Sequence, residues 1–248
     1  MFRLGCWCAL VGLLSVRLTA DTAQDIARIH VESIGGLARL ERFESLRSSG
    51  TTHMAGQILD IQMWAERPNR VRIESEVARD VLVQAWDGEH EPWIQVGRSG
   101  EARPLAPLAA AQFRAEADFY DPLYRPEERG FTLDYAGEDR IGDQTVLKLL
   151  VTRNLTEEFL LHLAADTYFI LRRDEMRQVG GQRIQTQTSF GDFRPVLGVI
   201  FPHRITVRSA EGVLYETVLD WTEGNPPIDP NIFAMPGRPE TRQAASSK

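Results

Sequence analysis

Residues 63–93 read MWAERPNRVRIESEVARDVLVQAWDGEHEPW, and this stretch predicts a run of antiparallel strands. Apolar and charged residues alternate over 70–77, which is typical of a strand with one buried and one solvated face. Over 81–86 both faces carry apolar side chains, so both must be covered by a core or by a ligand. An Arg-Pro-Asn turn at 67–69 and an Asp-Gly hairpin turn at 87–88 separate these strands, because Pro fixes φ and Asp-Gly suits a two-residue type I′ turn.

Further strands are predicted on both sides of this stretch, at short and regular spacing, beginning near Leu46. We expect about a dozen strands in all. Helices are predicted over 22–34, 37–43 and 108–120, where apolar residues recur at helical spacing. Residues 197–202 read as an irregular crossing before the last hairpin. This pattern favours an antiparallel barrel or a strongly curved sheet over a parallel α/β fold.

The first twenty residues are typical of a secretory signal peptide. Arg3 supplies the positive charge, and Ala20 occupies a plausible cleavage position. The apolar run over 6–16 is too short to span a bilayer. Both cysteines of the chain lie in this segment, so the predicted mature chain has no thiol, which suits an oxidising compartment.

The predicted mature chain is acidic. Two of the 28 lysines and arginines lie in the signal, which leaves 26 against 35 acidic residues and a net charge of −9. This balance argues against a nucleic-acid partner and against electrostatic docking on anionic lipid. We therefore divide the chain into a signal peptide (1–20), a single domain (21–236) and a disordered tail (237–248).

Catalytic motifs are absent from the sequence. It contains no Gly-x-Ser-x-Gly elbow, no His-Glu-x-x-His pair and no phosphate-binding glycine loop. Its five histidines have no metal-ligand spacing, although His53, His162 and His203 would share a site if their strands brought them together. We predict a protein that is not an enzyme and that needs no metal or other cofactor.

The order of the motifs resembles that of the LolA/LolB-like superfamily of periplasmic lipoprotein carriers, including its uncharacterised outer membrane lipoprotein-sorting members. The resemblance begins with the Trp-containing strand, the Arg-Pro-Asn triplet and the strand that ends in Asp-Gly. It continues through Asp-Thr-Tyr at 166–168, Gly-Val-Ile-Phe-Pro at 198–202 and the ending at 227–236, and it covers roughly residues 24–236. It implies an incomplete, strongly curved antiparallel β-barrel, with helices over its open side and an apolar cavity inside.

The resemblance also implies a function. The protein would be a periplasmic, non-enzymatic carrier that holds an acyl chain or a lipoprotein in the cavity, with a helical lid that opens for release. Its partners would be lipid or acylated protein, together with membrane-associated donor and acceptor proteins. The alternative is an envelope-stress sensor, or a protein- or peptide-binding module, on the same fold. Charged Arg70 and Arg72 and the insertion at 104–122 depart from the carriers, so the fold is compatible with another cargo.

The candidate ligand-binding residues come from the apolar surplus on the strands. We expect the cavity wall to include Trp64, Leu82, Trp86, Trp93 and Phe159. Each of these residues has an alternative place in an ordinary sheet core. In the carriers, the arginine of the corresponding Arg-Pro-Asn segment is implicated in holding the lid closed and in ligand release, which makes Arg67 the candidate latch. A guanidinium also suits unpaired carbonyls at a helix end, and the alternative is an exposed turn arginine.

Overall fold

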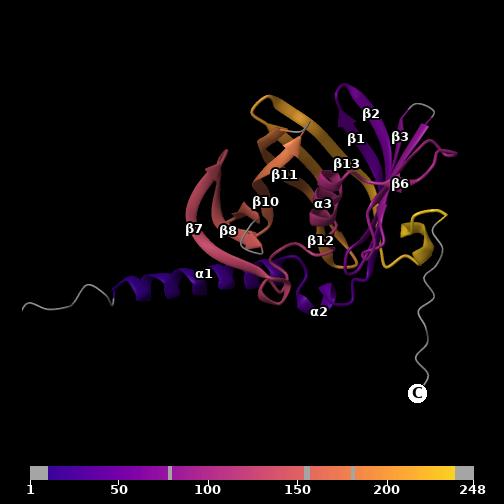
Figure 1. Ribbon diagram of the computed structural model, residues 1–248. Helices are drawn as coiled ribbons and strands as arrows, with labels where there is room; N and C mark the ends of the chain where they lie inside the picture. The colour runs from indigo at the N-terminus through magenta and orange to yellow at the C-terminus, as the bar shows by residue number, and fades with distance from the viewer. Residues whose placement is uncertain (1–10, 78–79, 154–156, 180–181, 238–248) are drawn as a thin grey trace, which may run out of the picture. The chain divides into compact units, whose positions relative to one another are not determined.

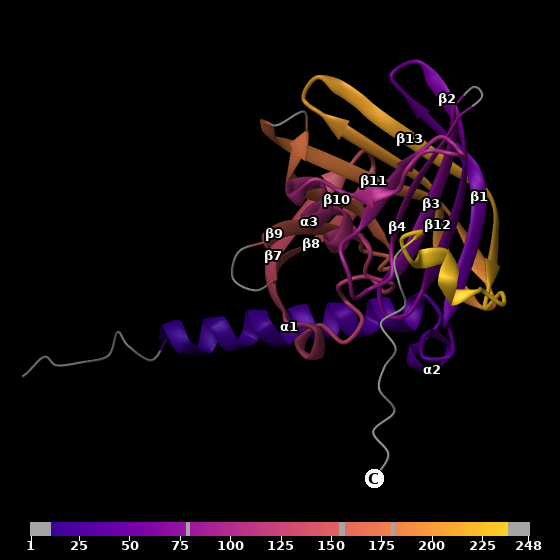
Figure 2. The same ribbon diagram turned by 45° about the vertical axis from the view of Figure 1, so that its right-hand side comes forward.

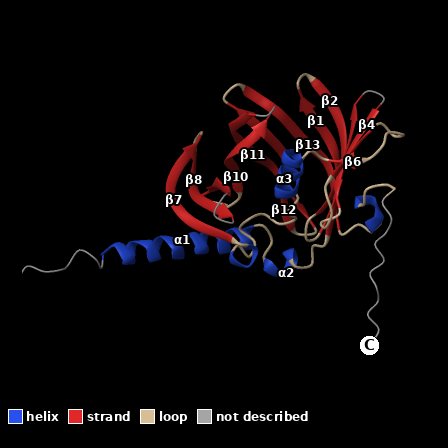
Figure 3. Ribbon diagram, in the orientation of Figure 1, coloured by secondary structure: helices blue, strands red, loops and turns tan. Residues whose placement is uncertain are grey.

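β-Strands dominate the computed structural model, which describes residues 11–77, 80–153, 157–179 and 182–237 (Figures 1 and 3). The helices are α1 (Val11–Ser33), α2 (Leu37–Leu40) and α3 (Pro107–Glu116), with the short 3-10 helices η1 (Glu127–Arg129) and η2 (Pro230–Phe233). The strands are β1 (Ser45–Met54), β2 (Gln57–Glu66), β3 (Arg70–Val77), β4 (Asp80–Trp86), β5 (Trp93–Val96), β6 (Arg103–Pro104), β7 (Phe131–Ile141), β8 (Gln144–Arg153), β9 (Glu157–Ala164), β10 (Ile170–Val179), β11 (Gln182–Val196), β12 (Val199–Ser209) and β13 (Gly212–Gly224).

The strands follow one linear hydrogen-bonded order, β6-β5-β4-β3-β2-β1-β13-β12-β11-β10-β9-β8-β7. Neighbours in this order are also consecutive in the chain, except for β1 and β13. The pairings with a defined register are antiparallel. Because β6 and β7 are the two ends of the order, the described strands form an open sheet. The predicted antiparallel sheet of about a dozen strands is confirmed, with 13 strands.

Contacts within the chain divide it into two compact units. Unit 1 consists of the described residues up to Phe43, Thr52–Gln57 and Tyr120–Asp220. Unit 2 consists of Glu44–Thr51, Ile58–Phe119 and the described residues from Trp221 onward. The boundary crosses β1 and β13, so each unit contains part of this strand pair.

The predicted helices are present with different bounds. α1 extends from Val11 to Ser33, so it begins before the expected start at Thr22. None of the helices formed by the described residues combines the length and the apolar character needed to cross a bilayer. Residues 1–10 and 238–248 and the expected turns at 154–155 and 180–181 lie outside the described ranges. The signal peptide, the single domain and the tail therefore stay predictions.

α1 packs on β7, β8 and β9 in unit 1. Figure 1 shows the C-terminal part of α1 beside one end of β7. Ala23, Ile26 and Ala27 are spaced three and four residues apart, which places them on one face of the helix. Their partners are fully or almost fully buried: Leu123, Phe131, Leu133, Leu149, Val151, Leu161 and Leu163. Each such side chain contributes about 1.5–3 kcal/mol when it leaves water. This cluster, which we call the α1 core, fixes the helix on one face of the sheet.

His30 connects α1 to two other segments of unit 1. Its Nδ1 lies 2.7 Å from the carbonyl oxygen of Tyr168, and its Nε2 lies 3.3 Å from Oδ2 of Asp121. Both neighbours are acceptors, so the imidazole satisfies both contacts only when both nitrogens carry protons. Burial acts to lower the pKa of His30, but the charge and hydrogen bond of Asp121 and the bond to Tyr168 outweigh it and raise the pKa.

Strand β4 in unit 2 is covered along one face and at one end of the other. Val81, Val83 and Ala85 form one cluster with Trp93 of β5, and Met235 packs against it. Figure 2 shows the C-terminal segment that carries η2 beside β3, on which it packs.

The opposite face of β4 is covered by α3 and the residue that follows it. Trp86 forms a cluster with Val71 of β3 and Ala117, and Phe113 of α3 packs against this cluster. α3 is therefore held on the sheet by the last residue of β4 and the second residue of β3.

The connection from β4 to β5 differs from the predicted two-residue hairpin. The two strands are joined by the six-residue loop 87–92. The Asp87 carboxylate accepts hydrogen bonds from the backbone N–H groups of Glu89 and His90, at 3.0 and 2.8 Å. Asp87 therefore closes a local turn through its side chain, which competes with the tight type I′ turn that Asp-Gly suggests.

The connection from β11 to β12 is a tight turn, so the predicted irregular crossing over 197–202 is wrong. Val196 pairs with Val199, which leaves Leu197 and Gly198 as the two turn residues. Their φ values of 50° and 80° are those that a type I′ turn requires at both central positions. Leucine is rare in this conformation, and the sequence pattern did not predict the turn.

Candidate functional site

One face of β2–β5 in unit 2 is almost entirely apolar. Directly paired residues of antiparallel strands project from the same face, and so do alternate residues along each strand. Val71 pairs with both Ala65 and Trp86, and Leu82 pairs with Val96. This register places Ser75, Gln84 and nine apolar side chains on one face. We call the nine the apolar face: Ile61, Met63, Ala65, Val71, Ile73, Leu82, Trp86, Ile94 and Val96.

α3 packs at one end of the apolar face. Val71 and Trp86 lie at that end and are buried. Farther along the face Met63 and Leu82 are half-buried, and Val96 is 57% exposed. An apolar surface that its own chain covers incompletely is suited to binding an apolar ligand.

Arg67 lies in the turn between β2 and β3. Its Nη2 donates to Oε1 of Glu44 at 3.1 Å, and its backbone N–H donates to the Glu44 carbonyl at 3.0 Å. The Pro68 carbonyl accepts from the N–H of Phe119 at 3.1 Å. The turn therefore ties the segment before β1 to the segment after α3.

Carbonyls near the end of α2 are satisfied in unit 1 by a tyrosine. The Tyr120 hydroxyl lies 2.8 Å from the carbonyl oxygen of Leu40 and 3.1 Å from that of Phe43. Arg129 donates to the carbonyls of Tyr120, Asp121 and Tyr124. Tyr120 therefore satisfies carbonyls near the end of α2, and Arg129 satisfies carbonyls of the loop that contains Tyr120.

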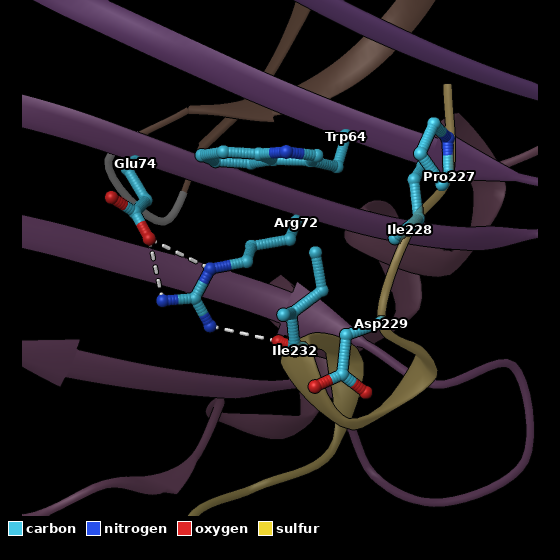
Figure 4. Close-up of a pocket in the computed structure, with 7 residues that line it drawn as sticks. All are labelled: Trp64, Arg72, Glu74, Pro227, Ile228, Asp229 and Ile232. Carbon is cyan, nitrogen blue, oxygen red and sulfur yellow. Dashed lines mark hydrogen bonds and ion pairs between the residues drawn. The ribbon is translucent and has the colours of Figure 1, made fainter. Parts of the chain in front are cut away.

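The other face of β2–β5 holds a pocket of about 360 Å³ in unit 2. It is lined by Trp64, Arg72, Glu74, Pro227, Ile228, Asp229 and Ile232 (Figure 4). Arg72 donates to Oε1 of Glu74 at 2.6 Å and to the Ile232 carbonyl at 2.8 Å. Trp93 donates through Nε1 to the Phe233 carbonyl at 2.8 Å. Arg72 and Trp93 thereby attach the C-terminal segment to the sheet.

The structure does not bring the six predicted site residues together. Leu82 and Trp86 share the apolar face. Trp64 and Trp93 belong to the opposite face, Trp64 at the pocket and Trp93 in the core cluster. Arg67 lies in the β2–β3 turn, and Phe159 packs against the α1 core in unit 1.

A charged cluster that the sequence analysis missed lies in unit 1. Arg173 pairs with Leu161 of the α1 core, and Glu175 pairs with Phe159, so both project from the face on which α1 packs. Oε1 of Glu175 accepts from Nη2 of Arg173 at 2.6 Å and from Nε of Arg177 at 2.5 Å. We call Arg173, Glu175 and Arg177 the charged cluster. Charges occupy nearly every position from 172 to 177, so alternation alone does not identify the face.

Two of the three histidines considered as metal ligands, His162 and His203, make other contacts. Nε2 of His162 lies 3.1 Å from Oδ2 of Asp174, and Nδ1 of His203 lies 3.0 Å from the Phe201 carbonyl oxygen. Among the described residues, no group of three or more His, Cys, Asp and Glu side chains is placed to hold a metal ion.

The open antiparallel sheet, with a helix on one face of each unit, defines a LolA-like fold. Solved structures with this fold include an outer membrane lipoprotein-sorting protein domain from Vibrio parahaemolyticus, with a TM-score of 0.61 and 9% identity over 86% of this chain and 97% of that one. A DUF1329 family protein from Desulfovibrio piger has a TM-score of 0.62 and 11% identity over 87% and 97% of the two chains. A LolA superfamily protein from Nitrosomonas europaea has a TM-score of 0.56 and 14% identity, with the same coverage.

Sequence comparison gives no closer assignment. No protein-family model matches the chain, and no curated protein matches its sequence. At identities this low, the likeness to solved structures establishes the fold alone.

Proposed function

We propose that this protein is a periplasmic carrier that holds an acyl chain, from a free lipid or an acylated protein, against the apolar face. The observation that carries the proposal is the apolar face itself, whose side chains remain half-buried or exposed beyond α3. The LolA-like fold supports it, because one solved protein with this fold is described as an outer membrane lipoprotein-sorting domain.

The energy of such binding comes from burial of the chain. Each methylene removed from water contributes about 0.8 kcal/mol. About ten buried methylenes therefore give about 8 kcal/mol, which corresponds to a dissociation constant of about 1 μM before any ordering cost. Holding and releasing a chain in this way needs no catalytic group.

Release requires that the cover over the apolar face move. α3 is the cover at the Trp86 end, and the segment after it is hydrogen-bonded to the turn that contains Arg67. We assign Arg67 as the latch, through its contacts with Glu44. Membrane-associated donor and acceptor proteins would then bind where this turn and α3 are accessible.

Displacement of a fluorescent fatty acid tests the proposal. Leu82→Glu places a charge on the apolar face and is expected to weaken binding by about 100-fold or more, since an unpaired charge against an acyl chain costs several kcal/mol. Ile58→Glu is the matched control, because Ile58 is 64% exposed and alternates to the other face of β2. Arg67→Leu is expected to keep the fold, because an exposed ion pair contributes at most about 1 kcal/mol, and to slow release by extending the apolar rim.

Circular dichroism of each variant provides the folding control. If the wild type does not bind the probe, the acyl-carrier proposal fails, and a peptide-binding or envelope-stress-sensing module becomes the better reading of the fold. If Leu82→Glu and Ile58→Glu weaken binding equally, the apolar face is not the site. If Arg67→Leu releases the probe at the wild-type rate, only the assignment of Arg67 as the latch fails.

A further inference from the structure

Three side chains on the pocket-bearing face of unit 2 alternate as ring, charge and ring. The Cζ atom of Arg47 on β1 lies 5.6 Å from the centre of the Trp64 ring on β2 and 5.8 Å from that of the Trp221 ring on β13. We call Arg47, Trp64 and Trp221 the arginine–tryptophan row, and all three belong to unit 2. Trp64 also lines the pocket of about 360 Å³, so the row leads directly into that pocket.

The row presents its rings and its charge to solvent. Arg47 is exposed, Trp64 is half-buried, and Trp221 is 45% exposed. The two rings hold the guanidinium between them, because the face of an indole attracts a cation. Tryptophan and arginine are also among the residues most enriched where protein interfaces bind most tightly. The composition of the row is therefore typical of a protein-binding surface.

The hydrogen-bond donors of the row are unused within the described part of the chain. The side chain of Arg47, which carries five N–H donors, forms no ion pair or hydrogen bond there, and the indole N–H groups of Trp64 and Trp221 donate to no acceptor. The other two tryptophans that the structure describes differ. The indole N–H groups of Trp86 and Trp93 donate to backbone carbonyls at 2.7 and 2.8 Å.

Two carboxylates on the same face as Trp64 are already paired. Glu66 alternates with Trp64 along β2 and accepts from Nη1 of Arg70 at 3.1 Å. Glu74 lies on β3 and accepts from Nη2 of Arg72 at 2.6 Å. Because each of these carboxylates has an arginine of its own, the charge of the row is left for a carboxylate from outside the chain.

The pocket beside the row suits an uncharged side chain. Oδ1 of Asp229 accepts from the backbone N–H of Asn231 at 3.0 Å, and the charge of this carboxylate disfavours a second one in the pocket. The apolar walls of the pocket are shown in Figure 4: Trp64, Pro227, Ile228 and Ile232. A site for a carboxylate and a site for an apolar side chain are therefore adjacent.

The C-terminal segment shows how this face holds a polypeptide. Arg72 and Trp93 are in a similar cation–π contact, at 5.6 Å. They donate to two successive backbone carbonyls of that segment, those of Ile232 and Phe233. An arginine and a tryptophan on this face therefore already bind one extended stretch of chain. The row offers the same two kinds of donor in an exposed position.

We propose that the arginine–tryptophan row and the adjoining pocket bind an acidic, extended segment of a partner protein. Arg47 binds a carboxylate of the segment, because a guanidinium matches a carboxylate in geometry. An apolar side chain two residues away enters the pocket beside Trp64. Such side chains project from one side of an extended chain about 6.6 Å apart, which lies between one and two strand spacings. The surface is opposite the apolar face, so this inference goes beyond the carrier proposal and does not rest on it.

Titration with short blocked peptides tests the inference through the indole N–H signals in NMR spectra. The probe is acetyl-Ala-Glu-Ala-Leu-Ala-amide, which carries a carboxylate and an apolar side chain two residues apart. The wild type is expected to bind it about tenfold or more tightly than the same peptide with Gln in place of Glu. A peptide with Ala in place of Leu tests the pocket and should bind about fivefold or more weakly. The signals of Trp64 and Trp221 should shift, and those of Trp86 and Trp93 should not.

Two variants assign the preference for Glu over Gln to the row. Arg47→Gln should reduce the ratio of the two affinities to about one. Arg103→Gln is the matched control, because Arg103 is exposed on β6 and pairs with Ile94 of the apolar face, so it projects from the other side of the sheet. It should keep the full ratio. Circular dichroism checks that both variants are folded, and both should bind the fluorescent fatty acid as the wild type does.

Each result supports or overturns the inference. A wild-type ratio of about one, a ratio that Arg47→Gln leaves intact, or no binding of the probe overturns the peptide site. Equal binding of a peptide with Lys in place of Glu overturns the assignment to an acidic segment. Oligothymidylate that shifts the same two signals at a lower concentration than the peptide assigns the surface to nucleic acid instead. Failure of the wild type to bind the fatty acid overturns the carrier proposal and leaves this inference standing.

Discussion

The two units use the same architectural element for different surfaces. In each unit a helix packs on one face of the strands, α1 on β7–β9 and α3 on β3–β4. Beyond α3 the face continues with apolar side chains such as Leu82 and Val96. Beyond α1 it continues with Arg173, Glu175 and Thr188.

The side chains beyond the helix therefore determine which chemical groups each face of this LolA-like fold is suited to bind. A mostly apolar continuation removes hydrocarbon from water without specificity for a head group. A continuation with half-buried arginines, by contrast, favours an anionic group.

The largest expected effect tests whether the α1 core and the apolar face differ in packing. Leu149 is fully buried in the α1 core, so Leu149→Ala should lower the free energy of unfolding by about 3 kcal/mol. Leu82 on the apolar face is half-buried, so Leu82→Ala should cost less than about 1.5 kcal/mol. Urea denaturation of both variants measures the difference. Equal losses in the free energy of unfolding would mean that Leu82 belongs to a packed core. The proposed difference in packing between the α1 core and the apolar face would then be wrong.

Much of the fold could be predicted from the sequence, because alternation reports burial directly. The two-sided apolar pattern at 81–86 indicated cover on both faces of β4, and the chain provides it along one face and at the Trp86 end of the other. The assignment of residues to faces could not be predicted, because it depends on register. Trp64 pairs with Arg72, whereas Trp86 pairs with the preceding residue of β3, Val71. Consecutive residues of a strand project from opposite faces, so Trp64 and Trp86 lie on opposite faces of the sheet. One residue more or less in a turn reverses this outcome.

The contacts of the charged residues Arg72 and Arg173 could not be predicted from the sequence either. Both are arginines on strands with an acidic residue two positions later. Arg72 donates to Glu74 and to the Ile232 carbonyl, whereas Nε and Nη2 of Arg173 both donate to Glu175. The sequence carries no signal for this difference, because the partner of Arg72 comes from a segment 160 residues away.

The second prediction compares these two arginines. Arg72→Gln breaks the attachment of the C-terminal segment and should lower the free energy of unfolding by about 2 kcal/mol, the usual range for a hydrogen bond from a charged group. Arg173→Gln should cost less, because Arg177 still pairs with Glu175. Thermal unfolding without ligand measures both. A larger loss for Arg173 would mean that the charged cluster contributes more to stability than the attachment of the C-terminal segment does.

The smallest expected effect concerns the attachment of α1 through His30. The raised pKa of His30 means that the folded protein holds this proton more tightly than the unfolded chain. The pair therefore adds stability below the ordinary histidine pKa of about 6.5, and that stability is lost as the pH rises through the folded-state pKa. Asp121 stays charged across this window: burial acts to raise its pKa, but His30 and nearby Arg129 help to lower it. Burial of His30 disfavours its charged form and so reduces the stability that the proton adds. We therefore expect only a small change in the free energy of unfolding with pH.

Urea midpoints at pH values of about 5.5 and 8 test this link. The wild type should lose stability between the two, whereas His30→Gln, which cannot gain a proton, should lose less. His53→Gln is the control, because His53 is exposed and should behave as the wild type does. If His30→Gln shows the wild-type pH dependence, His30 is not the titrating group. The apolar contacts of the α1 core would then carry the attachment of α1 at either pH, as the contacts with Val71 and Trp86 do for α3.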